Sequence, residues 1–146
     1  MKLIPYMCDF GGKCREAFDF YARALGGEVV GRTTYGESPV CERMPPGSAD
    51  LVMHSCLVAG DAVIMGADGP PAARGGDEGT AISINVDSTE DAERIWAALS
   101  AGADIRMPLR ETAWAHRWGM LVDRFGKPWM VNHLKTADDG PTPGHA

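Results

Sequence analysis

The sequence predicts an α+β protein built from two similar modules, and two observations carry this prediction. First, the order strand, helix, strand and β-hairpin occurs twice, on either side of a segment at 67–79 that is rich in Gly and Pro. Second, laying the later half of the chain over the earlier half places Gly102 on Gly27, each just beyond a helix. We therefore expect one module at 1–66 and the other at 80–135.

In the first module, a helix is predicted from Cys14 to Leu25. Apolar residues recur there at three- and four-residue spacing, and the glycine pair that follows supplies a left-handed stop. A loop is expected at 36–50, where prolines and glycines gather. The remaining apolar runs are interpreted as strands, at 3–8, 28–35, 51–58 and 62–65.

In the second module, Ser88 is predicted to cap a helix that ends before Gly102. The apolar runs around it are interpreted as strands, at 80–86, 103–109, 118–122 and 129–134, with a hairpin turn at 123–126. Each helix should cover one face of its sheet and leave the other face free, so that two free faces form a cleft. The tail at 136–146 has little to bury and is expected to be disordered.

The composition disfavours two classes of partner. The net charge is −6, the pI is about 5.1, and Lys and Arg are scattered, so the basic surface of a nucleic-acid-binding protein is missing. No segment approaches the roughly 20 apolar residues of a membrane span, and the first residues lack the apolar run of a secretory signal. We therefore expect a cytoplasmic protein with no nucleic-acid or membrane partner. Its four cysteines are expected to be free thiols there, with Cys8, Cys14 and Cys56 as small core residues.

The stretch from Glu111 to Asn132 is the predicted site. It holds three of the four tryptophans together with an acid, a histidine, an arginine and an amide. Its second half is predicted to be a β-hairpin, in which successive side chains point to opposite faces. Polar side chains that can bind a ligand thus alternate with side chains that can pack in a core.

Four groups of residues carry a family resemblance. They are the helix motif Ala17-Phe18-Asp19-Phe20-Tyr21 with Gly26-Gly27, the pair Met53-His54, the strand Ser83-Ile84-Asn85-Val86, and the run from Glu111 to Asn132. With them the chain resembles the vicinal-oxygen-chelate superfamily of glyoxalases, bleomycin-resistance proteins and extradiol dioxygenases, and within it the PhnB-like branch. The resemblance implies the glyoxalase/bleomycin-resistance fold, in which two βαβββ modules pair as curved mixed sheets around a cleft. It also implies a homodimer.

The same resemblance implies positions for a divalent metal, on the first and last strand of each module. In this sequence those positions fall at Tyr6 or Pro5, Met65, Ala81 and Met130. A phenol, two thioethers and an alanine do not provide the oxygen and imidazole ligands that Zn, Ni, Mn or Fe require. We therefore expect no metal and no cofactor. The alternative is a metal site formed elsewhere by His54, Glu111 and His116.

Two residues are candidates for acid–base catalysis, His54 and Glu111. His54 lies in an apolar strand, where it is either a core histidine with a hydrogen-bonded ring or a group that exchanges a proton near pH 7. Glu111 either forms an internal salt bridge with Arg117, or it removes a proton while Arg117 holds an anionic oxygen of the ligand.

The candidate ligand-binding residues are Met65, Trp114, Arg117, Trp129, Met130 and Asn132. Met65 and Met130 are expected to face each other across the cleft floor as flexible, apolar thioethers. Trp114 and Trp129 either pack in the core or form an aromatic wall against a planar ligand. Asn132 is a candidate hydrogen-bonding group for the ligand. The remaining histidines are expected at the surface, namely His116, His133 and His145.

These expectations favour a protein that binds a small organic molecule in an apolar cleft without a metal chelate, as its resemblance to bleomycin-resistance proteins implies. Two alternatives remain open. One is a metal-dependent lyase, isomerase or dioxygenase of the superfamily type. The other is a metal-independent enzyme that uses His54 or Glu111 as its acid–base group.

Overall fold

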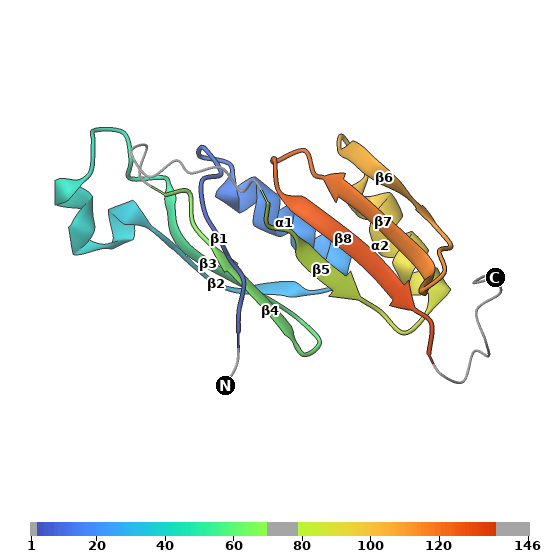
Figure 1. Ribbon diagram of the computed structural model, residues 1–146. Helices are drawn as coiled ribbons and strands as arrows, with labels where there is room; N and C mark the ends of the chain where they lie inside the picture. Colours follow the sequence, from blue (N-terminus) through green and yellow to red (C-terminus); the bar gives the residue numbers. More distant parts are fainter. Residues whose placement is uncertain (1–2, 70–78, 137–146) are drawn as a thin grey trace. The chain divides into compact units, whose positions relative to one another are not determined.

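The computed structural model describes residues 3–69 and 79–136 and divides into two compact units, 1–76 and 77–146 (Figure 1). The boundary falls within the predicted linker at 67–79. Residues 70–78 of that linker lie outside the described residues, as does nearly all of the predicted tail. Ala67 and Asp68 of the predicted linker are buried, so the packed part of the first unit extends beyond Gly66.

The described part of unit 1 contains one α-helix and a four-stranded mixed sheet. Its elements are β1 (Tyr6–Met7), α1 (Cys14–Leu25), β2 (Glu28–Thr34), β3 (Val52–Ala59) and β4 (Ala62–Gly66). The strand order is β1-β4-β3-β2, with β1 parallel to β4 and the other pairs antiparallel. The predicted loop at 36–50 contains two short 3₁₀ helices, η1 (Tyr35–Glu37) and η2 (Pro39–Arg43).

Helix α1 covers one face of this sheet. Its buried residues recur at helical spacing, and Gly26 ends it in the left-handed conformation with φ 66°. The approach of helix to strand is close, since a Cβ added to Gly66 of β4 would lie 2.8 Å from the ring of Phe18. Of the cysteines predicted to be core residues, Cys14 is buried, Cys56 is half-buried and Cys8 is exposed. Cys8 is exposed because β1 ends at Met7, before it reaches that residue.

Unit 2 repeats the arrangement. Its elements are β5 (Ile82–Asn85), α2 (Thr89–Leu99), β6 (Asp104–Arg110), β7 (Ala115–Val122) and β8 (Pro128–Leu134). The strand order is β5-β8-β7-β6, with β5 parallel to β8. Ser88 caps α2 as predicted, because its side chain accepts a hydrogen bond from the backbone N–H of Asp91.

The α+β architecture of two βαβββ units is therefore confirmed. In Figure 1 helix α2 lies behind β7 and β8, so that the opposite face of this sheet is turned toward the viewer. None of the described helices has the length and apolar character needed to span a membrane. The predicted cleft between the two modules stays a prediction.

Candidate functional site

The sheet of unit 2 has one face packed on α2 and one face without a helix, which we call the open face. Gly119 marks the packed face, because a Cβ placed there would lie 2.7 Å from the ring of Trp96 on α2. Side chains alternate along a strand, so Trp118 and Met120 of β7 belong to the open face. On β8 the same reasoning gives Met130 and Asn132, the register partners of Met120 and Trp118.

Strand pairing extends these residues into two rows across the open face. The methionine row contains Ser83, Met130, Met120 and Met107, one from each strand. The tryptophan row lies beside it and contains Asn85, Asn132, Trp118 and Arg110. Residues opposite each other in a sheet have Cβ atoms about 4.5–5.5 Å apart, so neighbours in a row are in contact range.

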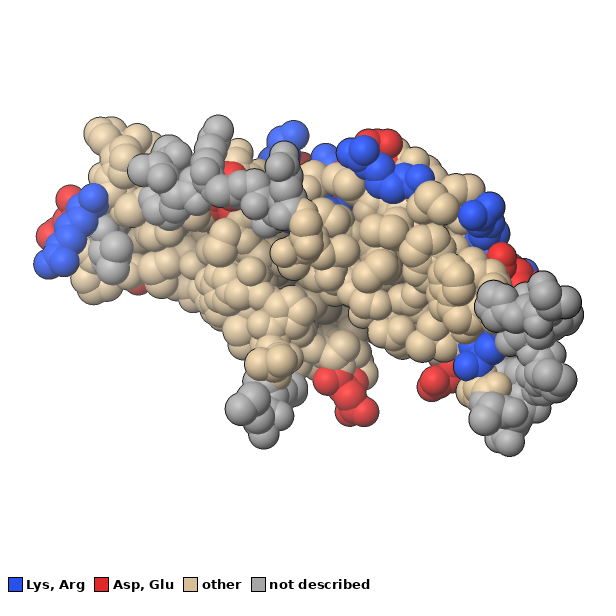
Figure 2. All heavy atoms as spheres, in the orientation of Figure 1, with Lys and Arg blue, Asp and Glu red and all other residues tan. Residues whose placement is uncertain are grey.

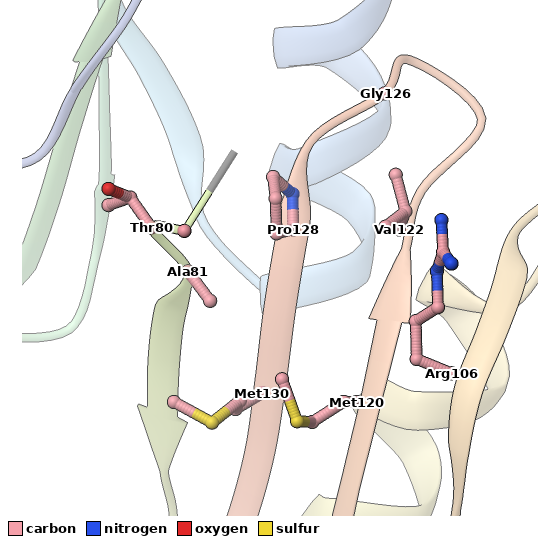
Figure 3. Close-up of a pocket in the computed structure, with 9 residues that line it drawn as sticks. Thr80, Ala81, Arg106, Met120, Val122, Gly126, Pro128 and Met130 are labelled. Atoms are coloured by element: carbon pink, nitrogen blue, oxygen red, sulfur yellow. The ribbon is translucent and has the colours of Figure 1, made fainter. Parts of the chain in front are cut away.

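A hollow of about 590 Å³ lies on the open face. Figure 3 shows Met120 and Met130 side by side in front of the strands, with Val122 and Pro128 farther along the same two strands. Uncharged side chains cover the centre of the face over β7 and β8 (Figure 2). The full lining comprises Gly79, Thr80, Ala81, Arg106, Met120, Val122, Gly126, Pro128 and Met130.

The arginine of this hollow already has a partner. The Arg106 guanidinium lies 3.0 Å from Oδ2 of Asp104, and both side chains are well exposed. A salt bridge of this kind neutralises the charge at the edge of the hollow. The remaining lining is uncharged, with the Thr80 hydroxyl beside apolar side chains, which suits a largely uncharged part of a ligand.

An exposed tryptophan, Trp114, packs against the half-buried Trp118 of the open face. Trp114 is 55% exposed, and its ring packs edge-on against Trp118 with centroids 5.7 Å apart and planes at 70°. The backbone of Trp114 is fixed by a hydrogen bond from the N–H of Lys135 to its carbonyl oxygen. Trp114, one of the predicted ligand-binding residues, is therefore placed where a ligand can reach it.

The other predicted tryptophan has a structural role. Trp129 is 1% exposed, and its indole N–H donates to Oδ2 of Asp123 at 2.8 Å. Its strand neighbour Met130 faces the hollow, so Trp129 faces the opposite side, toward the core under α2. We leave Trp129 out of the site proposed below.

Asn132 lies on the open face, but its amide is already engaged. It is 5% exposed, and its Nδ2 donates to Oγ of Ser83 at 2.8 Å and to the carbonyl of Ile84 at 3.3 Å. These bonds tie β8 to β5. Asn132 therefore supports the sheet beneath the tryptophan row.

Arg117 and Glu111 each have another partner in place of the predicted salt bridge between them. Arg117 donates from Nε to Oε1 of Glu93 on α2 at 2.8 Å, which holds its charge on the packed face. Glu111 lies 2.8 Å from Nζ of Lys135. The hydrogen bond from Lys135 lowers the pKa of Glu111, so that this carboxylate is a weaker base than an unpaired glutamate.

The remaining histidines of unit 2 are partly enclosed. His116 and His133, predicted at the surface, are both half-buried, with ring centroids 4.7 Å apart. His133 is also hydrogen-bonded through Nδ1 to Oγ1 of Thr89 at 3.0 Å, at the beginning of α2. His145 lies outside the described residues.

Unit 1 has an open face of its own. Ser55 and Leu57 of β3 are buried on the α1 side, so His54 and Cys56 belong to the other face. Cys56 pairs with Met65 on β4, and Met65 pairs with Tyr6 on β1.

Tyr6 gives His54 a specific partner on this face. Tyr6 Oη and His54 Nδ1 are hydrogen-bonded at 3.2 Å, and the two rings lie 5.8 Å apart. Partial burial raises the pKa of the Tyr6 phenol, which keeps it protonated at neutral pH. Of the predicted site residues, the structure thus brings His54 and Met65 to one unit and the others to the second.

Comparison with known proteins places this geometry in a family. The sequence model of the glyoxalase/bleomycin resistance protein/dioxygenase superfamily matches residues 5–131. The chain belongs to this superfamily. Protein YjdN of Escherichia coli strain K12 is 32% identical over 143 residues, which cover 92% of this chain and 97% of YjdN.

Solved structures of the superfamily agree with the fold. Protein PA1353 of Pseudomonas aeruginosa is similar with a TM-score of 0.82 and 42% identity, covering 91% of this chain and 97% of that chain. The PhnB protein of Bacillus cereus gives a TM-score of 0.75 at 21% identity, covering 91% and 99%. The predicted superfamily is confirmed by the family model, and the likeness to the PhnB protein at 21% identity shows a shared fold.

The superfamily's metal positions are occupied by residues that do not fit a divalent metal. Ala81, which the resemblance gives as a metal position, precedes β5, and the β5 residue paired with Met130 is Ser83, while Met65 pairs with Tyr6. A phenol, a hydroxyl and two thioethers do not match the ligand sets of zinc or of the harder divalent ions. Among the residues described, no group of three His, Cys, Asp or Glu side chains is arranged to hold a metal ion.

Several site residues were missed at the sequence level. Met107, Arg110, Trp118 and Met120 join the open face of unit 2, and Tyr6 joins His54 in unit 1. A glycine between two large side chains in β7 was a usable signal, because a strand glycine often marks a close approach by another element. If Gly119 faces the helix, its neighbours Trp118 and Met120 must face away.

Proposed function

We propose that this superfamily member binds a small organic molecule in the hollow on the open face of unit 2, without a metal chelate. The observation that carries the proposal is the hollow itself, about 590 Å³ with Met120 and Met130 as its floor. This volume lies within the range of about 300–1,000 Å³ that small-molecule sites occupy.

The chemistry of the floor favours an apolar, adaptable fit. Thioethers are flexible and polarisable, and sulfur packs well against the edge of an aromatic ring. Val122 and Pro128 extend the apolar surface, while the Arg106–Asp104 pair leaves little net charge at its edge. A planar apolar ring system of moderate size suits these contacts.

The test is binding of phenylnaphthylamine, a neutral aromatic probe whose fluorescence rises in apolar surroundings. We expect saturable binding, and we expect Met130→Glu to weaken it about tenfold or more, because a carboxylate in the hollow must be desolvated when the probe binds. Ile105→Glu is the matched control, since Ile105 is an exposed residue of β6 outside the hollow lining. Circular dichroism verifies that each variant is folded, and Met120→Glu replaces Met130→Glu if the latter unfolds. Equal binding by the folded variant and the wild-type protein would exclude the hollow as the site.

A second candidate activity is acid–base chemistry on the open face of unit 1, and the Tyr6–His54 hydrogen bond favours it. The hydrogen bond between the phenol and Nδ1 leaves Nε2 of His54 as the ring nitrogen that can exchange a proton with a ligand. Glu111 is the weaker candidate, since its ion pair with Lys135 stabilises the charged form. In an assay for any reaction of a bound ligand, His54→Ala should abolish turnover without loss of fold, and unchanged turnover would exclude His54.

Two further properties are proposed from family membership. The chain is proposed to form a homodimer in the cytoplasm, with neither a nucleic acid nor a membrane as partner. Light scattering after size-exclusion chromatography measures the mass in solution. A monomer at all accessible concentrations would contradict the dimer.

A further inference from the structure

We propose that the molecule bound by unit 2 is an aromatic compound with one anionic group, and that Arg110 binds the anion while Trp118 contacts the ring. This inference rests on the proposed function, because it specifies the ligand of the same open face. It extends the site from the methionine row to the tryptophan row beside it.

Strand register places the cation next to the ring surface. Arg110 of β6 is the partner of Trp118 of β7, as Met107 is the partner of Met120. Two register shifts in β6, between Ile105 and Met107 and between Met107 and Arg110, each place one extra residue of β6 opposite β7, and Arg110 is the partner of Trp118 after the second shift. Trp118 and Arg110 lie outside the lining of the hollow, in the row next to Met120 and Met107. A ligand that extends from the methionine floor toward this row would meet them.

The charge of Arg110 is available, in contrast to that of its neighbours. Arg117 is held by Glu93 on the packed face, and Arg106 is held by Asp104. Within the described ranges 3–69 and 79–136, the salt bridges involve Arg32, Arg94, Arg106, Arg117 and Lys135, and none includes Arg110. A guanidinium can bind a carboxylate or sulfonate through two parallel N–H bonds.

The aromatic part of the site is held ready for a ring. Trp114 packs edge-on against Trp118, and its own backbone is fixed by Lys135, so the indole pair presents a defined surface. The amide of Asn132 supports Trp118 from the neighbouring strand by its bonds to β5. Ring contact to Trp118 and an ionic contact to Arg110 together recognise a molecule that has both groups.

Because Arg110 is a single cation, we expect the ligand to carry a single anionic group. The chain carries a net charge of −6, so a ligand with several negative charges would be repelled by the protein as a whole. A single carboxylate or sulfonate at the end of an apolar ring system suits the arrangement. A neutral ring system should bind more weakly, through the methionine row and Trp118 alone.

The test compares two probes that share one ring system, anilinonaphthalene sulfonate and the neutral phenylnaphthylamine. We expect the sulfonate to bind the wild-type protein about tenfold more tightly, and Arg110→Gln to remove this preference while leaving the neutral probe within about twofold. Arg94→Gln is the matched control, because Arg94 is an exposed arginine of α2. The preference should also fall as salt concentration rises.

Failure of the inference is distinguishable from failure of the proposed function. The inference is wrong if both probes bind equally and Arg110→Gln changes neither affinity. The hollow would then bind a ligand, but Arg110 would not contact the anionic group of that ligand. If neither probe binds, or if Met130→Glu leaves both affinities unchanged, the proposed site itself is wrong. Loss of sulfonate binding in Arg94→Gln to the same extent would likewise overturn the role of Arg110, since the effect would be one of net charge.

Discussion

The two units share one topology but present different chemistry on their open faces. At matching register positions unit 1 has Tyr6, Met65 and Cys56, whereas unit 2 has Ser83, Met130 and Met120. Unit 1 therefore offers a phenol near an imidazole, and unit 2 offers a methionine floor. The difference shows that a few strand residues on the open face set the chemistry while the fold stays the same.

The packed faces are alike where the open faces differ. Each helix approaches its sheet at a strand glycine, Gly66 beneath Phe18 in unit 1 and Gly119 beneath Trp96 in unit 2. Each unit also contains one buried aspartate that accepts backbone N–H bonds, and each is 4% exposed. The two aspartates accept hydrogen bonds from different donors, so we expect their removal to destabilise the protein to different extents.

The largest expected effects come from removing these carboxylates. Asp123 accepts from the backbone N–H groups of Phe125 and Lys127 and from the indole of Trp129, whereas Asp68 accepts from the N–H groups of Cys14 and Val52. We expect Asp123→Ala to lower the free energy of unfolding by about 3–4 kcal/mol and Asp68→Ala by about 2–3 kcal/mol, because buried donors lose their partners. Urea unfolding followed by circular dichroism measures both.

Spectroscopy can show which unit each aspartate stabilises. All four tryptophans lie in unit 2, so their fluorescence reports that unit. Asp123→Ala should shift the fluorescence transition, and Asp68→Ala should shift circular dichroism more than fluorescence if the units unfold separately. Asp87→Ala, at an exposed aspartate, is the control and should change stability by less than about 0.5 kcal/mol. An equally small effect of Asp123→Ala would contradict the role assigned to it.

Intermediate effects are expected from alanine at the two close-approach glycines. A Cβ on Gly66 would lie 2.6 Å from the backbone oxygen of Met7 and 2.8 Å from Phe18, and neither can move easily. A Cβ on Gly119 would meet Trp96, which is half-buried and has more room to shift. We expect losses of about 2–3 kcal/mol for Gly66→Ala and about 1–2 kcal/mol for Gly119→Ala, measured by thermal unfolding.

Gly31 provides the control for both substitutions. It is a strand glycine of β2, and a Cβ there would have nothing within 4 Å. Gly31→Ala should therefore be neutral or slightly stabilising. If Gly119→Ala proves as mild as Gly31→Ala, the assignment of the packed face of unit 2 needs revision.

The smallest effect concerns the ion pair at the beginning of the predicted site stretch. The pKa of Glu111 is lowered from 4.5 by Lys135, so the pair contributes stability above pH 4.5 that is lost as pH falls through the folded pKa. We expect Glu111→Gln to be slightly less stable than the wild-type protein at pH 7 and equal to it at about pH 2. Unfolding at both pH values measures this difference, and a difference that grows on acidification would have the wrong sign for this pair.

Much of the fold could be predicted because local patterns determine it. Helix α1 has the predicted bounds, since its apolar spacing and the glycine that ends it are local signals. Strand β7 begins at Ala115, earlier than the predicted residue 118, because Ala115 and Arg117 pair with Leu134 and His133 of β8. Partners of this kind are brought together only by the tertiary structure. They cannot be recognised from the alternation of apolar and polar residues along β7.

The site was less predictable because faces and partners depend on register. Trp118 and Trp129 look equivalent in the sequence, but β7–β8 pairing puts one on the open face and the other in the core. The same is true of the arginines, since only the position of Glu93 on α2 shows that Arg117 is engaged. Among the described residues no salt bridge of Arg110 is found. The superfamily could be recognised from motifs, whereas the residue beside Met130 required the observed strand register.

The methionine row also makes the hollow sensitive to oxidants. Met107, Met120 and Met130 are partners in one row across β6, β7 and β8, and Met120 and Met130 line the hollow. Oxidation of a thioether to the sulfoxide adds a polar oxygen, and methionine sulfoxide reductases reverse it. A floor that is apolar in the reduced protein would then be polar in the oxidised one, so the affinity for an apolar ring would report the redox state of the surroundings.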